Sequence, residues 1–230
     1  MYERARPGYP DDAVRWLAGD EPCDVVDLGA GTGKLTRSLV AHGHRVTAVE
    51  PSPEMLAQLR SAVPDASPLL GSAEFVPLPD ESADVVTVAQ AFHWFDQVVA
   101  LREIARVLRP GGRIALVWNA RDDTEAWVAE FTDTVIARST FRKGGVALAA
   151  ASIDDSGLYG PVERGTFAHV QSLGRSELLE LVRSRSECAV LSEEERRPLL
   201  ENADALFDAH AKDGMLSMPY VTECFRAARR

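Results

Sequence analysis

The stretch VVDLGAGTGKLT at residues 25–36 decides the fold class, because an apolar strand-like run passes directly into three glycines at alternating positions. Glycines in such a turn let the backbone approach a ligand without a side-chain clash. The helix expected over Lys34–His42 presents its first N–H groups at the same place. The stretch therefore predicts a strand, a ligand-binding loop and a helix, in that order.

Strand and helix patterns continue to alternate along the first half of the chain. We expect strands at residues 23–28, 45–49, 68–70, 84–89 and 113–118. Between them, Ser52 is placed to cap a helix that has Pro53 at its first position. A later helix has one apolar face, made by Leu101, Ile104, Ala105 and Leu108, and Pro110–Gly112 is expected to separate it from the next strand. This alternation favours an α/β fold with a doubly wound, mostly parallel sheet.

The regular alternation of strand and helix patterns ends after about Arg121. We expect a helix with Trp127, Phe131 and Val135 on one face, a loop over the small residues 144–152, and strands at residues 165–171 and 220–225. Ser192 and Glu195 fit a capping box, which opens a helix with an inward face. That face consists of Leu199, Ala203, Leu206 and Phe207. Since no long linker interrupts the chain, we expect a single domain over residues 1–230.

Composition and charge exclude several classes of protein. The 230 residues carry 35 acidic and 25 basic side chains, a formal net charge of −10, which argues against a duplex nucleic-acid binder. The longest uncharged run, Val85–Phe95, has 11 residues, well short of the roughly 20 that a membrane helix needs. Three cysteines without CxxC spacing indicate neither disulfides nor a zinc site, and no metal is expected. With a charged N-terminus, these features favour a cytoplasmic protein without membrane or nucleic-acid partners.

Two familiar glycine-loop ligands fit poorly. A Walker phosphate loop would need glycine where Leu28 stands, and a hydroxyl residue where Leu35 stands. The dinucleotide fingerprint would need glycine or alanine in place of Lys34, which weakens that interpretation without excluding it.

The spacing that fits is GxGxG, and with it the chain resembles the class I S-adenosylmethionine-dependent methyltransferases. The resemblance is closest to the small-molecule branch that includes trans-aconitate-type enzymes. It covers residues 23–119, with support from Tyr2–Pro10. Its segments are the glycine loop, VEPSPEML at residues 49–56, GSAEFVPLP at 71–79, QAFHWF at 90–95 and LRPGGRIAL at 108–116.

The resemblance implies a Rossmann-like methyltransferase fold with an antiparallel C-terminal strand and a helical cover. Residues 1–22 would form an N-terminal cover segment, 23–119 the cofactor-binding core, and 120–230 the lid helices and the rest of the sheet. The cofactor-binding residues that it implies are Gly29, Ala30, Gly31, Gly33, Glu50, Pro51, Met55, Ser72, Ala73, Glu74 and Gln90. Among these, Glu50 would accept hydrogen bonds from the ribose hydroxyls. Ser72 departs from the commoner pattern, in which an aspartate occupies that position.

The expected function is methyl transfer from S-adenosylmethionine to an oxygen (carboxylate or hydroxyl) or nitrogen atom of a small organic acceptor. His93 is the candidate catalytic base, and a histidine that only orients the loop explains the position as well. The candidate acceptor-binding residues are Tyr2, Arg6, Tyr9 and Trp94. Alternatives are a methyltransferase acting on RNA or protein, and a non-catalytic module that binds the cofactor. A monomer or a homodimer is expected.

Overall fold

The computed structural model describes residues 6–135, 144–183, 188 and 191–230. The chain divides into two compact units. The larger unit comprises residues 8–118, 143–167 and 222–230, and the smaller unit comprises residues 1–7, 119–142 and 168–221. Each unit is described below by itself.

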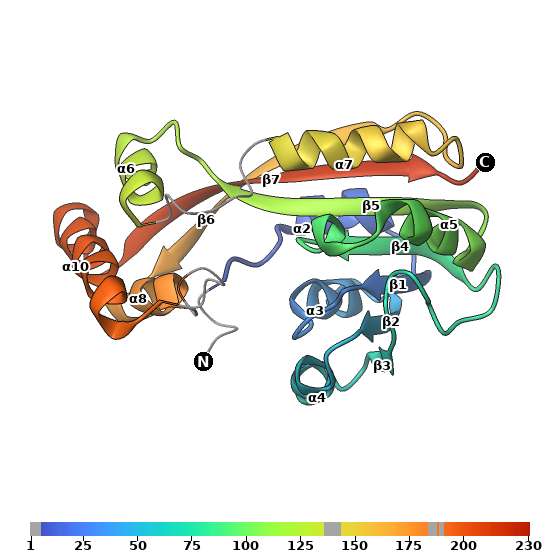
Figure 1. The fold of residues 1–230 in the computed structure, drawn as a ribbon, viewed down its shortest axis with the longest axis horizontal. Coiled ribbons are helices and arrows are strands. Elements are labelled where there is room, and N and C mark those ends of the chain that lie inside the picture. The colour runs from blue at the N-terminus through green and yellow to red at the C-terminus, as the bar shows by residue number, and fades with distance from the viewer. Residues whose placement is uncertain (1–5, 136–143, 184–187, 189–190) are drawn as a thin grey trace. The chain divides into compact units, whose positions relative to one another are not determined.

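The described strands form one sheet in the order β3-β2-β1-β4-β5-β7-β6. They are β1 (Asp24–Leu28), β2 (Arg45–Glu50), β3 (Ser67–Leu70), β4 (Ala83–Ala89), β5 (Leu108–Arg121), β6 (Glu163–Leu173) and β7 (Leu216–Ala228). Parallel ladders join β3 to β2, β2 to β1, β1 to β4 and β4 to β5. The C-terminal strand β7 runs opposite to β5 (Figure 1). The predicted doubly wound, mostly parallel sheet with an antiparallel C-terminal strand is confirmed.

Helices of the larger unit connect and cover these strands. They are α2 (Asp11–Ala18), α3 (Lys34–Ala41), α4 (Pro53–Ala62), the 3₁₀ turn η1 (Phe92–Trp94), α5 (Gln97–Val107) and α7 (Gly144–Asp155). α3 packs against β2, α4 against β3, and α7 against both α5 and η1. The cap predicted for α4 is present, since Ser52 Oγ accepts a hydrogen bond from Met55 N. None of the helices in the described part of the chain combines the length and apolar character that a membrane crossing requires.

The helix α2 was not expected, because residues 1–22 were assigned to a cover segment. Its Val14 and Leu17 are fully buried and pack in one cluster with Leu35 and Leu39 of α3. Burying one leucine side chain stabilises a fold by about 1.5–3 kcal/mol. Part of the expected cover segment therefore belongs to the core.

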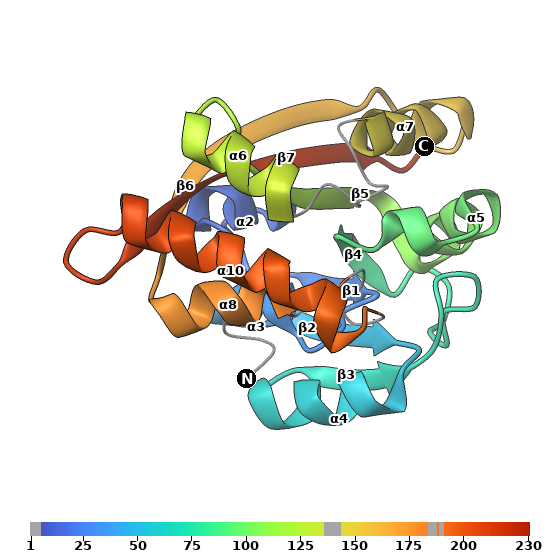
Figure 2. The same ribbon diagram turned by 60° about the vertical axis from the view of Figure 1, so that its left-hand side comes forward.

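The smaller unit has its own apolar core. Its helices are α6 (Ala126–Val135), α8 (Arg175–Arg183) and α10 (Glu193–His210), and α10 packs against both others (Figure 2). The predicted capping box at Ser192 and Glu195 is present at the start of α10. Ala203, Leu206 and Phe207 are buried as predicted, in one cluster with Phe131.

Two local predictions were wrong. Residues 144–152 form most of α7 rather than a loop, because the stretch contains several alanines and a leucine, which are strong helix formers, and the helix places Ala149, Ala150 and Ile153 in buried positions. Pro110–Gly112 does not separate helix from strand. α5 already ends at Val107, and β5 begins at Leu108, so that the three residues form an irregularity within β5.

Candidate functional site

The carboxyl ends of β1, β2 and β4 define the candidate site. β1 lies between β2 and β4 and is parallel to both, so the sheet order reverses at β1. In open α/β sheets, ligands bind outside the carboxyl ends of the strands at such a switch point. The glycine loop follows β1, Glu50 ends β2, and Gln90 follows β4. All three belong to the larger unit.

The three glycines of the loop play different structural roles. Gly29, Gly31 and Gly33 have φ values of 68°, 58° and 89°, which side-chain-bearing residues rarely adopt. A Cβ on Gly29 would lie 2.9 Å from Ala91 Cβ, and one on Gly33 would lie 2.9 Å from Leu59 Cγ. A Cβ on Gly31 would meet no atom within 4 Å. Gly29 and Gly33 are therefore required by close packing, whereas Gly31 faces open space.

Glu50 is buried, with 6% of its surface exposed, and its carboxylate is held by backbone donors. Gly31 N donates to Oε2 at 2.8 Å, and Ser52 N donates to Oε1 at 3.0 Å. A carboxylate has about four acceptor positions, so these two bonds leave others available. The side chain thus links the glycine loop to the start of α4 and can still accept hydrogen bonds from a ligand.

A second buried carboxylate, Asp27, lies beneath the glycine loop and was not singled out from the sequence. Thr36 Oγ1 donates to it at 2.6 Å, and Thr87 Oγ1 donates to it at 2.9 Å. Burial raises the pKa of Asp27 to about 6. The signal that could have revealed it is an acid within an apolar strand directly before the glycines. Asp27 ties β1 to α3 and β4 and so supports the loop.

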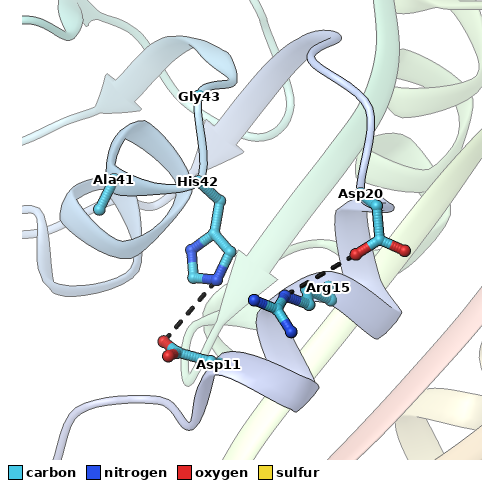
Figure 3. A pocket seen from close by; sticks show the side chains of 6 residues that line it. All are labelled: Asp11, Arg15, Asp20, Ala41, His42 and Gly43. Atoms are coloured by element: carbon cyan, nitrogen blue, oxygen red, sulfur yellow. Dashed lines mark ion pairs between the residues drawn. The ribbon is translucent and has the colours of Figure 1, made fainter.

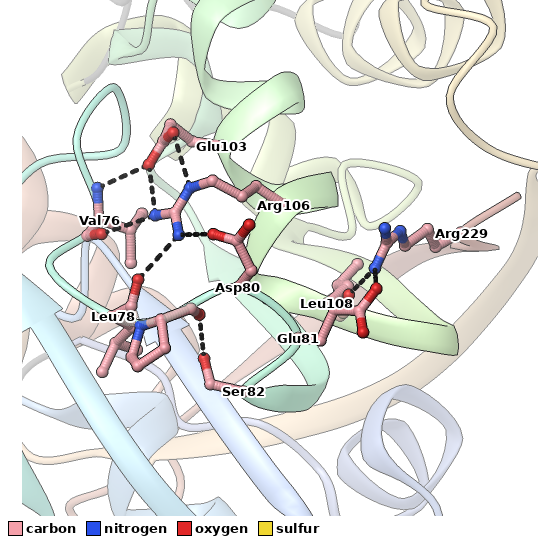
Figure 4. Close-up of polar contacts among 10 residues, drawn as sticks. Val76, Leu78, Asp80, Glu81, Ser82, Glu103, Arg106, Leu108 and Arg229 are labelled. Carbon is pink, nitrogen blue, oxygen red and sulfur yellow. Dashed lines mark hydrogen bonds and ion pairs between the residues drawn. The ribbon is translucent and has the colours of Figure 1, made fainter.

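The segment after β3 is fixed to α5 by an arginine (Figure 4). Arg106 donates to the carboxylates of Glu103 and Asp80 and to the backbone oxygens of Val76 and Leu78. These contacts hold residues 76–80 in place. The segment follows the three residues that are implied to lie at the edge of the adenine ring. Of these three, Ala73 is buried, and Ser72 and Glu74 are partly buried.

Other implied cofactor residues differ in exposure. Met55 is 39% exposed at the start of α4, and Pro51 is exposed. Ala30 N and Gly29 N both donate to Val49 O, which fixes the beginning of the loop. Gln90 has a φ of 57° and donates from its backbone N to Val117 O. A non-glycine residue in this conformation is uncommon and is often found at functional sites.

The candidate base His93 lies in η1, next to Trp94. Its ring centroid is 5.0 Å from that of Trp94. Burial lowers the pKa of His93 below its ordinary value of 6.5, so the imidazole is neutral at pH 7 and can accept a proton. Trp94 is 75% exposed. The structure thus brings the candidate base and one candidate acceptor-binding residue together.

The N-terminal candidates are described only in part. Tyr2 lies outside the described residues. Arg6 is exposed and belongs to the smaller unit. Tyr9 is partly buried against the core cluster that contains Val14. Their role in acceptor binding stays a prediction.

Figure 3 shows a hollow of the larger unit at the C-terminal end of α3. It is lined by Asp11, Arg15, Asp20, Ala41, His42 and Gly43. His42 Nε2 and Asp11 Oδ1 are 3.7 Å apart across it. Ala41 ends α3, whereas the glycine loop precedes the first residue of that helix, about 12 Å away along its axis. The hollow is therefore not part of the candidate site.

Comparisons with known proteins agree with the fold and the loop. The family model described as "Methyltransferase domain" matches residues 26–116. An uncharacterized methyltransferase of Mycobacterium tuberculosis is 43% identical over 229 residues, which cover 98% of this chain and 91% of that protein. A solved structure from Anaeromyxobacter dehalogenans, titled as a type II methyltransferase, is 27% identical with a TM-score of 0.69 and covers 98% of this chain and 97% of its own.

These matches cover nearly the whole chain as well as its core. The chain belongs to the class I S-adenosylmethionine-dependent methyltransferases. It is an enzyme of this family, and S-adenosylmethionine is its methyl donor. The prediction made from the glycine loop is confirmed at this level, and the narrower trans-aconitate-type resemblance stays a prediction.

Proposed function

We propose that this enzyme transfers a methyl group from S-adenosylmethionine to an oxygen or nitrogen atom of a small organic acceptor, bound beside the carboxyl ends of β1, β2 and β4. The observation that carries the proposal is the buried carboxylate of Glu50, held by Gly31 N and Ser52 N with acceptor positions to spare. It fits an adenosine-containing donor, because two ribose hydroxyls can fill those positions.

The remaining cofactor contacts follow from the same placement. The backbone of Gly29, Ala30, Gly31 and Gly33 borders the methionyl part, together with Gln90. Met55 offers an exposed thioether side chain to the adenine face, and Pro51 precedes its helix. The adenine edge is met by the segment Ser72–Glu74, which precedes the residues that Arg106 holds.

His93 takes the acceptor's proton when the acceptor is a hydroxyl or an amine. The bound cofactor supplies an electrophilic methyl group on a sulfonium. The neutral imidazole of His93 would receive the proton that such an acceptor loses on methylation. A carboxylate acceptor needs no base. Arg6, with Tyr2 and Tyr9, would bind an acceptor carboxylate, since guanidinium groups pair with carboxylates bidentately.

Two relatives support a division between donor and acceptor recognition. A malonyl-[acyl-carrier protein] O-methyltransferase of Methylococcus capsulatus matches 42% of this chain, and a ubiquinone/menaquinone biosynthesis C-methyltransferase of Rubrivivax gelatinosus matches 50% of it. Their names specify oxygen and carbon acceptors. We infer that the part in common serves the donor and that residues elsewhere select the acceptor.

The acceptor class is tested by following a labelled methyl group. The enzyme is incubated with methyl-labelled S-adenosylmethionine and a cell extract separated into small molecules, RNA and protein. We expect the label to enter the small-molecule fraction. Label in RNA or protein would contradict the proposal, and so would an enzyme that binds the cofactor but labels no fraction.

The pH dependence of the reaction tests the role of His93. With a hydroxyl or amine acceptor, kcat/KM should rise as the pH increases through the lowered pKa of His93, because only the neutral imidazole accepts a proton, and it should level off by about pH 7. His93→Gln should remove this rise and lower kcat by about 10²–10⁴-fold. A carboxylate acceptor should be methylated at an unchanged rate. An unaltered profile in the variant would contradict the assignment.

A further inference from the structure

The turn η1 is anchored against the glycine loop on both of its sides. A Cβ on Gly29 would lie 2.9 Å from Ala91 Cβ and 3.2 Å from Phe95 Cζ, and these two residues directly precede and follow η1. Within the turn, Phe92 is fully buried, and its ring meets that of Phe95 edge-on at a centroid distance of 5.9 Å. Buried and partly buried apolar side chains therefore hold the turn in place beside the proposed cofactor site.

The indole of Trp94 is not among these side chains. It is 75% exposed, whereas Trp118 is only 2% exposed and Trp16 packs against the core. The anchored turn therefore holds a large aromatic side chain in water beside the proposed cofactor site. The neutral imidazole of His93 lies next to it, with the two ring planes at 41°. The turn thus presents a flat apolar face and a proton acceptor side by side.

We propose that Trp94 is the platform on which the methyl acceptor lies, and that this acceptor is a planar aromatic molecule carrying a hydroxyl or carboxyl group. The inference rests on the proposed function. An aromatic ring stacks favourably on an indole, and the gain exceeds that from apolar burial alone. A hydroxyl at the edge of that ring would lie near His93, which could take its proton, whereas a carboxylate there needs no base.

A second exposed aromatic side chain provides a matched comparison. Phe75 is 73% exposed and lies on the segment after β3, which is joined to this region by a hydrogen bond from Asp96 N to Glu74 Oε1. Phe75 is not part of the turn anchored on Gly29. A general apolar patch would need both aromatic rings, whereas a stacking platform needs Trp94 alone.

The test uses binding of matched probe pairs to the full chain saturated with S-adenosylhomocysteine. The aromatic probes are phenol, catechol and 4-hydroxybenzoate, and their saturated counterparts are cyclohexanol, cyclohexane-1,2-diol and 4-hydroxycyclohexanecarboxylate. Titration calorimetry is performed on the wild type, Trp94→Ala, Trp94→Phe and Phe75→Ala. At least one aromatic probe should bind about tenfold more tightly than its counterpart, and Trp94→Ala should abolish this preference.

The controls separate this inference from the proposed function. Trp94→Phe should retain the preference within about threefold, Phe75→Ala should leave it unchanged, and S-adenosylhomocysteine should bind all four proteins equally. Absence of aromatic preference in a wild type that binds S-adenosylhomocysteine would overturn the platform alone. Equal losses in Trp94→Ala and Phe75→Ala, or a changed sedimentation coefficient in Trp94→Ala, would overturn it in favour of a general or self-associating apolar surface. Failure to bind S-adenosylhomocysteine would instead count against the proposed function.

Discussion

Replacing Glu50 with glutamine is expected to weaken S-adenosylhomocysteine binding by about ten- to a hundredfold. A hydrogen bond to a charged group contributes roughly 1.5–3 kcal/mol, and each 1.4 kcal/mol is about tenfold in affinity. Glutamine keeps the shape of the side chain but has one acceptor oxygen, which the donors at Gly31 and Ser52 already require. Titration calorimetry on the purified variant measures the loss.

The ligand itself supplies the control for Glu50. An S-adenosylhomocysteine analogue that lacks the ribose hydroxyls should bind the wild type weakly. Its affinity for Glu50→Gln should be no lower than its affinity for the wild type. The two changes should therefore not add, as expected for groups in direct contact. Additive losses would indicate that Glu50 acts on the loop alone and does not meet the ribose.

Replacing Gly31 with alanine should yield a folded protein that has lost most of its cofactor affinity. The φ of 58° imposes a strain of about 1–2 kcal/mol on a residue with a Cβ, and no protein atom lies within 4 Å of that Cβ. The new methyl group would project into the space that we assign to the cofactor. Overpacking costs about 1–3 kcal/mol, so the affinity should fall by roughly five- to a hundredfold.

Gly157 is a matched control for Gly31. Its φ is 68°, and a Cβ there would also meet nothing within 4 Å. Gly157→Ala should therefore lower the midpoint of thermal unfolding by as much as Gly31→Ala while leaving S-adenosylhomocysteine affinity intact. An equal loss of affinity in both variants would show that backbone strain causes the effect. It would refute the assignment of the space beside Gly31 to the cofactor.

Much of the fold could be predicted, because strand and helix periods in residues 23–119 are clear and punctuated by glycine and proline. The helix α2 could not, since Asp11–Ala18 spans only about two turns and no side chain caps it. The helix α7 was missed because small residues resemble a loop when packing is unknown. The order of the strands depends on pairing between distant residues, such as Val25 with Val85, which no local pattern specifies.

Some roles of the site residues could likewise be predicted from the sequence, and others could not. The glycine loop and Glu50 are adjacent to strand ends, so their roles could be inferred from sequence. That Glu50 accepts hydrogen bonds from both Gly31 N and Ser52 N depends on how two loops meet and could not be inferred. The same holds for Asp27, whose partners Thr36 and Thr87 come from different elements.

A crystal structure of the enzyme with S-adenosylhomocysteine tests the central claim most directly. The decisive measurement is the distance from the two ribose hydroxyl oxygens to the carboxylate of Glu50. We predict that both lie within hydrogen-bonding distance, about 2.5–3.0 Å, with the ligand passing over Gly31. A ribose bound elsewhere, with the Glu50 carboxylate bonded only to Gly31 N and Ser52 N, would contradict the account.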